Sequence, residues 1–137
     1  MELDNIWQLP EDSIEHPVIT GGRVYIAGGM LSGPGGGQCT SFRGKVYAEF
    51  IEALSGHSLY SDELDQEAIE EIAGALEEFQ AEYNLLEGRA RYEFLKNLFS
   101  DSVSAYRIET CLETLEHLTI MFRKYSEMEG VTLTSWY

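Results

Sequence analysis

A glycine-rich loop is the stretch of this sequence whose residue types are best suited to chemistry. It follows an apolar run at residues 23–27 and precedes a helical pattern that begins near Ser41. A loop of this kind between a strand and a helix cradles phosphate, because bare backbone N–H groups and the helix N-terminus both attract an anion. A nucleotide-binding enzyme or sensor that uses residues 28–37 is therefore one hypothesis. Its candidate ligand-binding residues are Arg23, Gly35, Gly36, Gly37, Arg43 and Lys45.

Neither familiar phosphate-binding fingerprint is complete in this loop. A P-loop that ends at Gly44-Lys45 needs glycine at position 39 and serine or threonine at position 46, where the sequence has Cys39 and Val46. A dinucleotide-binding pattern that begins at Gly33 needs its third glycine at position 38, where the sequence has Gln38. A flexible loop without a ligand is the alternative interpretation.

Residues 23–30, RVYIAGGM, resemble the opening strand of nucleoside 2-deoxyribosyltransferases, which has the form VYIAGPM. Gly29 stands where that family has proline, and an acidic helical pattern follows in place of the alternating strands of its doubly wound sheet. No residue downstream matches the catalytic carboxylate of that family. The resemblance therefore covers one short strand and implies neither the family's fold nor its activity here.

The cysteines and histidines are the other residues that could react. Cys39 lies on a locally basic loop, where a lowered pKa would make it a nucleophile with His57 or His117 as the base. No C-x-x-C pattern is present, so reduced thiols in a cytoplasmic protein are the simpler interpretation of Cys39 and Cys111. His16, His57 and His117 have no short ligand spacing. The sequence predicts no metal, no cofactor and no catalytic residue.

The charge of the chain limits its partners. Asp and Glu outnumber Lys and Arg by 24 to 9 in 137 residues, which gives a formal net charge of −15. Such a surface repels free nucleic acid and anionic membranes, and no apolar run is long enough for a membrane span. A basic protein partner is the better match.

The acids are concentrated on one predicted helix, over residues 62–84. Twelve acidic residues and no Lys or Arg lie between Lys45 and Arg89, so the glutamates on the outer face of this helix have no cation at i+4. Most charge runs are merely solvated faces, but the lack of mixed charge also fits a surface that docks on a basic groove. We call this set the acidic ridge and predict that it binds a partner: Glu63, Glu67, Glu70, Glu71, Glu77, Glu78 and Glu82.

The periodicity of the chain predicts one domain of α+β class that is mainly helical. Residues 1–16 form an acidic arm, which Trp7 pins to the body of the protein or, as the alternative, to a partner. Residues 17–45 contain a β-hairpin, with strands at 17–20 and 23–27 joined by Gly21-Gly22, and the glycine-rich loop. Residues 46–137 form the helical part.

Three or four helices are expected to pack on the hairpin and loop. The first is capped by Thr40 or Ser41 and ends before Gly56; the second is the acidic helix; the third follows Gly88. The last spans 103–128 after a cap at Ser100-Asp101-Ser102, pairs antiparallel with the acidic helix and offers an apolar stripe for a homodimer. A short strand follows within 131–137.

Size and charge favour a small non-enzymatic binding protein that occludes a basic, nucleic-acid-binding site on another protein. Small acidic inhibitors made by phages against CRISPR or restriction nucleases resemble it in these two respects, and mimicry of DNA is one way to achieve such inhibition. The sequence does not separate an inhibitor from an adaptor subunit, because the two differ only in the fate of the partner.

Overall fold

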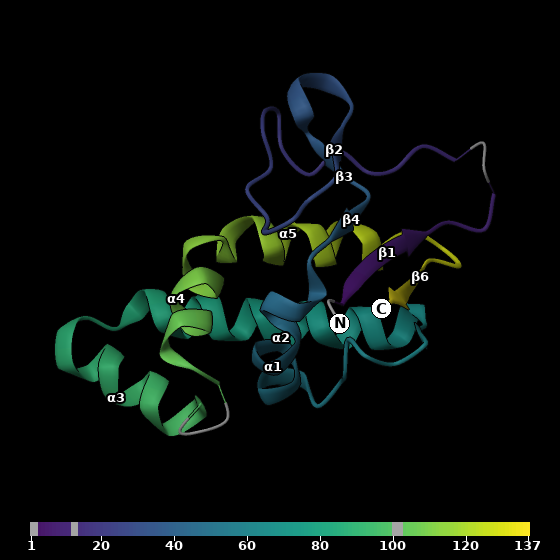
Figure 1. Cartoon of the computed structure of the whole chain (residues 1–137). Coiled ribbons are helices and arrows are strands. Elements are labelled where there is room, and N and C mark those ends of the chain that lie inside the picture. Colours follow the sequence, from purple (N-terminus) through teal and green to yellow (C-terminus); the bar gives the residue numbers. More distant parts are fainter. Residues whose placement is uncertain (1–2, 12–13, 100–102) are drawn as a thin grey trace.

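The computed structural model describes residues 3–11, 14–99 and 103–137 and shows a mainly helical α+β fold, which confirms the predicted class (Figure 1). A four-stranded antiparallel sheet has the order β4-β1-β6-β5, and a separate two-stranded ladder joins β2 to β3. The elements are β1 (Asp4–Gln8), β2 (Leu31–Ser32), the 3-10 turn η1 (Pro34–Gly36), β3 (Gln38–Cys39), β4 (Ser41–Phe42), α1 (Gly44–Ser55), β5 (Glu63–Leu64), α2 (Gln66–Leu85), α3 (Gly88–Phe99), α4 (Ala105–Glu113), α5 (Leu115–Ser126) and β6 (Thr132–Trp136).

The expected N-terminal arm is wrong over residues 4–8, which form β1 in the interior of the sheet. Strand β1 pairs with β4 on one side and β6 on the other. Trp7 points to the core, where it stacks on Tyr125 with ring centroids 4.1 Å apart. The prediction that Trp7 packs against its own chain is confirmed. Trp7 does so as part of strand β1, not from the end of an arm.

The expected hairpin over residues 17–27 is also wrong. This segment has no strand, and Gly21 and Gly22 lack the positive φ that a type I′ turn requires. Its backbone bonds to the glycine-rich loop instead: the Ile19 N–H donates to the Gly37 carbonyl at 2.7 Å and the Val24 N–H to the Gly36 carbonyl at 3.3 Å. The observed hairpin joins β2 to β3 inside that loop.

Helices α1, α2 and α3 occupy the regions where three helices were predicted. The cap predicted at Thr40 or Ser41 is wrong, because β4 occupies residues 41–42 and α1 begins only at Gly44. Gly56 ends α1 with φ 79°, as expected of a C-terminal glycine. Asp65 caps α2 by accepting a bond from the Ala68 N–H at 2.9 Å.

The single last helix predicted over 103–128 is divided into α4 and α5. The break lies at Thr114, whose φ of −108° and ψ of 7° depart from helical values and whose hydroxyl is 2.7 Å from that of the buried Tyr47. The cap predicted at residues 100–102 lies outside the described residues, and α4 is capped by Ser104. Strand β6 confirms the short strand expected near residue 132.

Helices α2 and α5 run side by side in opposite directions, as predicted (Figure 1). The apolar stripe of α5 is buried inside its own chain at Leu118, Met121 and Phe122. The stripe on which the homodimer prediction rested is therefore already covered, and the homodimer stays a prediction. Within the described ranges, no helix is both long and apolar enough to cross a bilayer.

Candidate partner-binding surface on helix α2

The acidic ridge is held in place by the opposite face of its helix. Ile69, Ile72 and Leu76 on that face are buried against the rest of the core, and this packing fixes the rotation of α2. Six glutamates then project from the solvent side of α2, and Glu63 precedes them in β5. All seven predicted ridge residues are exposed. The structure therefore brings the predicted partner-binding residues together on one surface.

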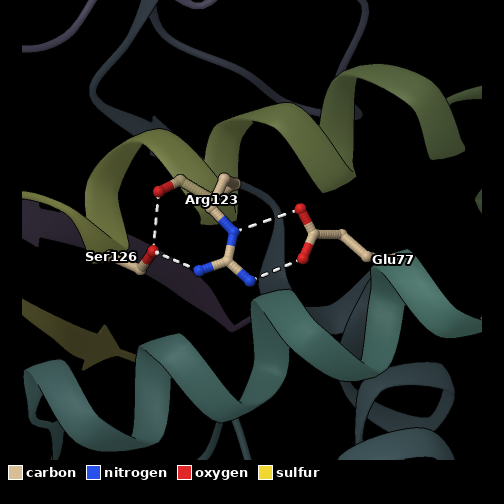
Figure 2. Close-up of polar contacts among 3 residues, drawn as sticks. All are labelled: Glu77, Arg123 and Ser126. Atoms are coloured by element: carbon tan, nitrogen blue, oxygen red, sulfur yellow. Dashed lines mark hydrogen bonds and ion pairs between the residues drawn. The ribbon is translucent and has the colours of Figure 1, made fainter.

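Two ridge members have partners that the sequence did not reveal. Arg123 of α5 donates from Nε to Glu77 at 3.1 Å and from Nη2 at 2.5 Å, and Nη1 donates to the Ser126 hydroxyl at 3.4 Å (Figure 2). Hydrogen bonding from Arg123 lowers the pKa of Glu77. His57 Nε2 lies 3.4 Å from a Glu71 carboxylate oxygen. The expectation of a wholly unpaired ridge is therefore wrong at Glu77, which joins α2 to α5.

The rest of the ridge carries uncompensated charge. Among the described residues, no cation lies within ion-pair distance of the following five: Glu63, Glu67, Glu70, Glu78 and Glu82. From Glu67 to Glu82 the helix rises about 22 Å at about 1.5 Å per residue. Its six glutamates stand at uneven steps of about 1.5 to 9 Å along the axis, with a mean of about 4.5 Å. They form a row of acidic side chains along about four turns of α2.

No family model matches this sequence, and no curated protein or solved structure matches it in the comparisons made.

The glycine-rich loop is folded and uses its own polar groups. The Gly36 N–H donates to the Gly33 carbonyl at 3.1 Å, and the Gly37 N–H donates to the Pro34 carbonyl at 2.9 Å. Gly37 is buried, and a Cβ at this position would lie 2.3 Å from the Thr20 carbonyl oxygen. The close packing explains why glycine is required here, and two of the N–H groups expected to hold phosphate are already engaged.

The three basic residues of the nucleotide hypothesis have separate surroundings. Arg23 lies beside Gly36 at the tip of the loop, whereas Arg43 at the start of α1 pairs with Asp4 at 2.7 Å. The Lys45 N–H, one of the free donors expected at a helix start, donates to the Leu3 carbonyl at 3.1 Å. No described contact joins Arg23 to Arg43 or Lys45. Nucleotide binding stays a prediction, and this geometry adds no support to it.

The cysteines lie in surroundings that oppose nucleophilic chemistry. Both are buried, and burial raises the pKa of the Cys39 thiol to about 11 and that of the Cys111 thiol to about 12. We expect iodoacetamide at about pH 8 to leave both thiols unmodified in the folded protein and to alkylate both in denaturant, as intact mass would show. Rapid stoichiometric labelling of Cys39 in the folded protein would restore the nucleophile hypothesis.

The described polar contacts of the two candidate bases, His57 and His117, do not involve Cys39. His117 Nδ1 accepts from the Tyr25 N–H at 2.9 Å, and His57 faces Glu71. His16 Nδ1 lies 2.7 Å from the Tyr125 hydroxyl, and burial lowers the pKa of His16. The described residues contain no group of three His, Cys, Asp or Glu side chains that could hold a metal ion.

Sequence patterns missed the link between Glu77 and Arg123 because they compare neighbours on one helix. The two residues are 46 positions apart and meet only when α2 and α5 pack. The same packing creates a pocket beside the ridge, whose residues belong to both helices. The predicted antiparallel pairing of the acidic helix with the last helix was the only indication, from the sequence, of the Glu77–Arg123 pair or of this pocket.

Proposed function

We propose that this is a small acidic binding protein, without enzymatic activity, that occludes a basic nucleic-acid-binding site on another protein. The observation that carries the proposal is the row of exposed glutamates on α2 that lack ion-pair partners among the described residues. Leaving such a row unneutralised costs stability through like-charge repulsion, and a basic partner removes that cost.

The proposed mechanism is competition for the partner's basic groove. A nucleic acid binds such a groove largely by exchanging counterions for Lys and Arg side chains. Six carboxylates spread over about 22 Å of a rigid helix present a row of negative charges to the same groove, because the rise of an α-helix is about 1.5 Å per residue. The buried face of α2 holds this row in place before binding, which reduces the ordering cost of association. An inhibitor of a nuclease in the cytoplasm, such as the CRISPR or restriction enzymes that phage inhibitors block, is the form that we favour.

The test is a neutralised ridge compared with an equal charge change elsewhere. The ridge variant combines Glu67→Gln, Glu70→Gln, Glu78→Gln and Glu82→Gln and keeps Glu77, which has a structural role. The control variant changes four exposed glutamates of α1 and α4: Glu49→Gln, Glu52→Gln, Glu109→Gln and Glu113→Gln. Proteins that the unmodified protein captures from a lysate at low salt are identified and purified. The affinity of each candidate is then measured for the unmodified protein, the ridge variant and the control variant. The measurements are repeated with DNA as a competitor for the candidate.

We expect the ridge variant to lose about 2 kcal/mol of binding free energy, roughly thirtyfold in affinity, since each exposed ion pair contributes up to about 1 kcal/mol. The control variant should bind as the unmodified protein does, and both DNA and added salt should displace the partner. Equal losses in the two variants would mean that net charge alone acts. Undiminished binding by the ridge variant would refute the proposal.

A further inference from the structure

A small pocket of about 170 Å³ lies beside the acidic ridge, where α1, α2 and α3 meet. Apolar side chains from all three helices form its floor and walls: Leu54, Ala75, Phe79, Phe94 and Leu98. Leu98 is 39% exposed, so solvent reaches this apolar surface. Sites for small molecules usually measure about 300–1,000 Å³, so this pocket has room for one long side chain rather than for a complete ligand.

Two glutamates of the acidic ridge, Glu78 and Glu82, complete the lining. They are one turn apart on α2, both are exposed, and like charges at this spacing repel each other. Glu82 also lies in the last turn of α2, where the helix dipole disfavours negative charge and where no basic residue is present. A cation placed between the two carboxylates would relieve both effects.

The nearby cations of α3 have other surroundings. Arg91 donates from Nη2 to the Tyr83 carbonyl at 3.1 Å, and its guanidinium lies 4.0 Å from the centre of the Tyr83 ring. Arg89 lies 3.8 Å from a carboxylate oxygen of Glu93. Lys96 lines a separate pocket between α3 and α4. None of these three basic residues lines the pocket beside the ridge, so its negative charge suits a cation from outside the chain.

We propose that this pocket takes an arginine side chain of the basic partner. The inference rests on the proposed function and names the partner residue that anchors the complex. The methylene groups of the arginine lie against Phe79 and Leu98, because long basic side chains cover apolar surface with their stems. The guanidinium donates to Glu78 and Glu82 together, since it has five N–H donors in a planar fork, whereas a lysine ammonium is a compact and strongly hydrated charge.

The test is an NMR titration of the whole chain with N-acetyl-arginine amide, whose ends carry no charge. N-acetyl-citrulline amide is the matched probe, because it has nearly the same shape and no positive charge. We expect millimolar concentrations of the arginine probe to shift the signals of Leu54, Ala75 and Leu98, and the citrulline probe to leave them unchanged. Equal binding of the two probes, or shifts that spread evenly along α2, would overturn the inference.

Neutralising the rim tests the role of the two carboxylates. Glu78→Gln combined with Glu82→Gln should weaken binding of the arginine probe about tenfold, because two exposed ion pairs are lost. The control variant, Glu109→Gln with Glu113→Gln, makes the same charge change at the same spacing on exposed positions of α4. It should bind the arginine probe as the unmodified protein does. Equal losses in the two variants would contradict a specific site.

Filling the pocket while keeping both carboxylates tests the apolar wall. Ala75→Leu should weaken binding of the arginine probe and of the captured partner roughly fivefold, because the arginine stem loses its apolar contact. Ala81→Leu, at an exposed position of α2 outside this pocket, is the matched control and should bind both normally. Unchanged partner affinity in Ala75→Leu would overturn the inference.

The two proposals fail in different ways. If the arginine probe does not shift the pocket signals, but neutralising the acidic ridge still releases the partner, the arginine site alone is wrong. If the probe binds in the pocket, but the ridge variant keeps its partner, the proposed function alone is wrong.

Discussion

Trp7→Ala is expected to destabilise the protein by about 3–5 kcal/mol, the usual cost of truncating a buried tryptophan. The Trp7 side chain is 2% exposed and lies between several aromatic rings. It stacks on Tyr125 and meets Phe122 edge to face, with ring centroids 5.1 Å apart. The variant leaves a large cavity between β1 and α5. Urea unfolding followed by circular dichroism measures the loss.

Trp136→Ala is the matched control for this prediction. Trp136 lies on β6, in the same sheet, but is 69% exposed, so its removal should change the free energy of unfolding by no more than about 0.5 kcal/mol. A loss below about 1 kcal/mol for Trp7→Ala would contradict the buried position of Trp7. It would favour the acidic arm that the N-terminal sequence first indicated.

Gly44→Ala is expected to cost about 2–3 kcal/mol, although alanine is ordinarily the better helix former. A Cβ at Gly44 would lie 1.7 Å from Asn5 Oδ1. Asn5 is fully buried and donates from Nδ2 to the Leu59 carbonyl at 3.0 Å, so it cannot move aside without breaking that bond. The substitution therefore pushes the start of α1 away from β1. Thermal and chemical unfolding both measure the effect.

Gly74→Ala tests the same chemical change where space is available. Gly74 lies inside α2, and nothing is within 4 Å of the position that its Cβ would take. Alanine should therefore stabilise the protein by up to about 1 kcal/mol through helix propensity alone. Opposite signs at the two glycines would show that contact with Asn5 decides the effect at Gly44. A neutral or stabilising Gly44→Ala would contradict the close packing.

The spacing of apolar residues predicted a helix well where the helix buries a single face. The three- and four-residue spacing of Ile72, Leu76 and Phe79 predicted α2 and placed the ridge glutamates on its outer side. Strand β1 could not be predicted in this way, because its neighbour β6 lies at the other end of the sequence. Without knowledge of β6, the acidic residues at positions 1–16 favoured an exposed arm over a strand of the sheet.

Tertiary contacts also explain the remaining differences. The apolar pattern continues through Thr114, so periodicity gave no sign that α4 ends there, where the Thr114 hydroxyl contacts that of Tyr47 on α1. The expected hairpin segment is apolar because Ile19, Val24 and Ile26 are buried in the core, while its backbone bonds to the glycine-rich loop. Sequence periodicity does not distinguish this arrangement from two strands that pair with each other. The sequence predicted which glutamates form the acidic ridge. It could not predict the structural role of Glu77, because that role depends on Arg123 of the neighbouring helix α5.

The pairing of β1 with β6 sets the order in which the protein can fold during translation. Strand β1 leaves the ribosome before its partner at residues 132–136, which is made more than a hundred residues later. Closing a loop of that length costs about 4 kcal/mol of chain entropy, which the sheet recovers only when β6 arrives. Until then Trp7 lacks the aromatic ring of Tyr125 on which it stacks. Until β6 is made, the nascent chain therefore leaves the apolar ring of Trp7 open to chaperones.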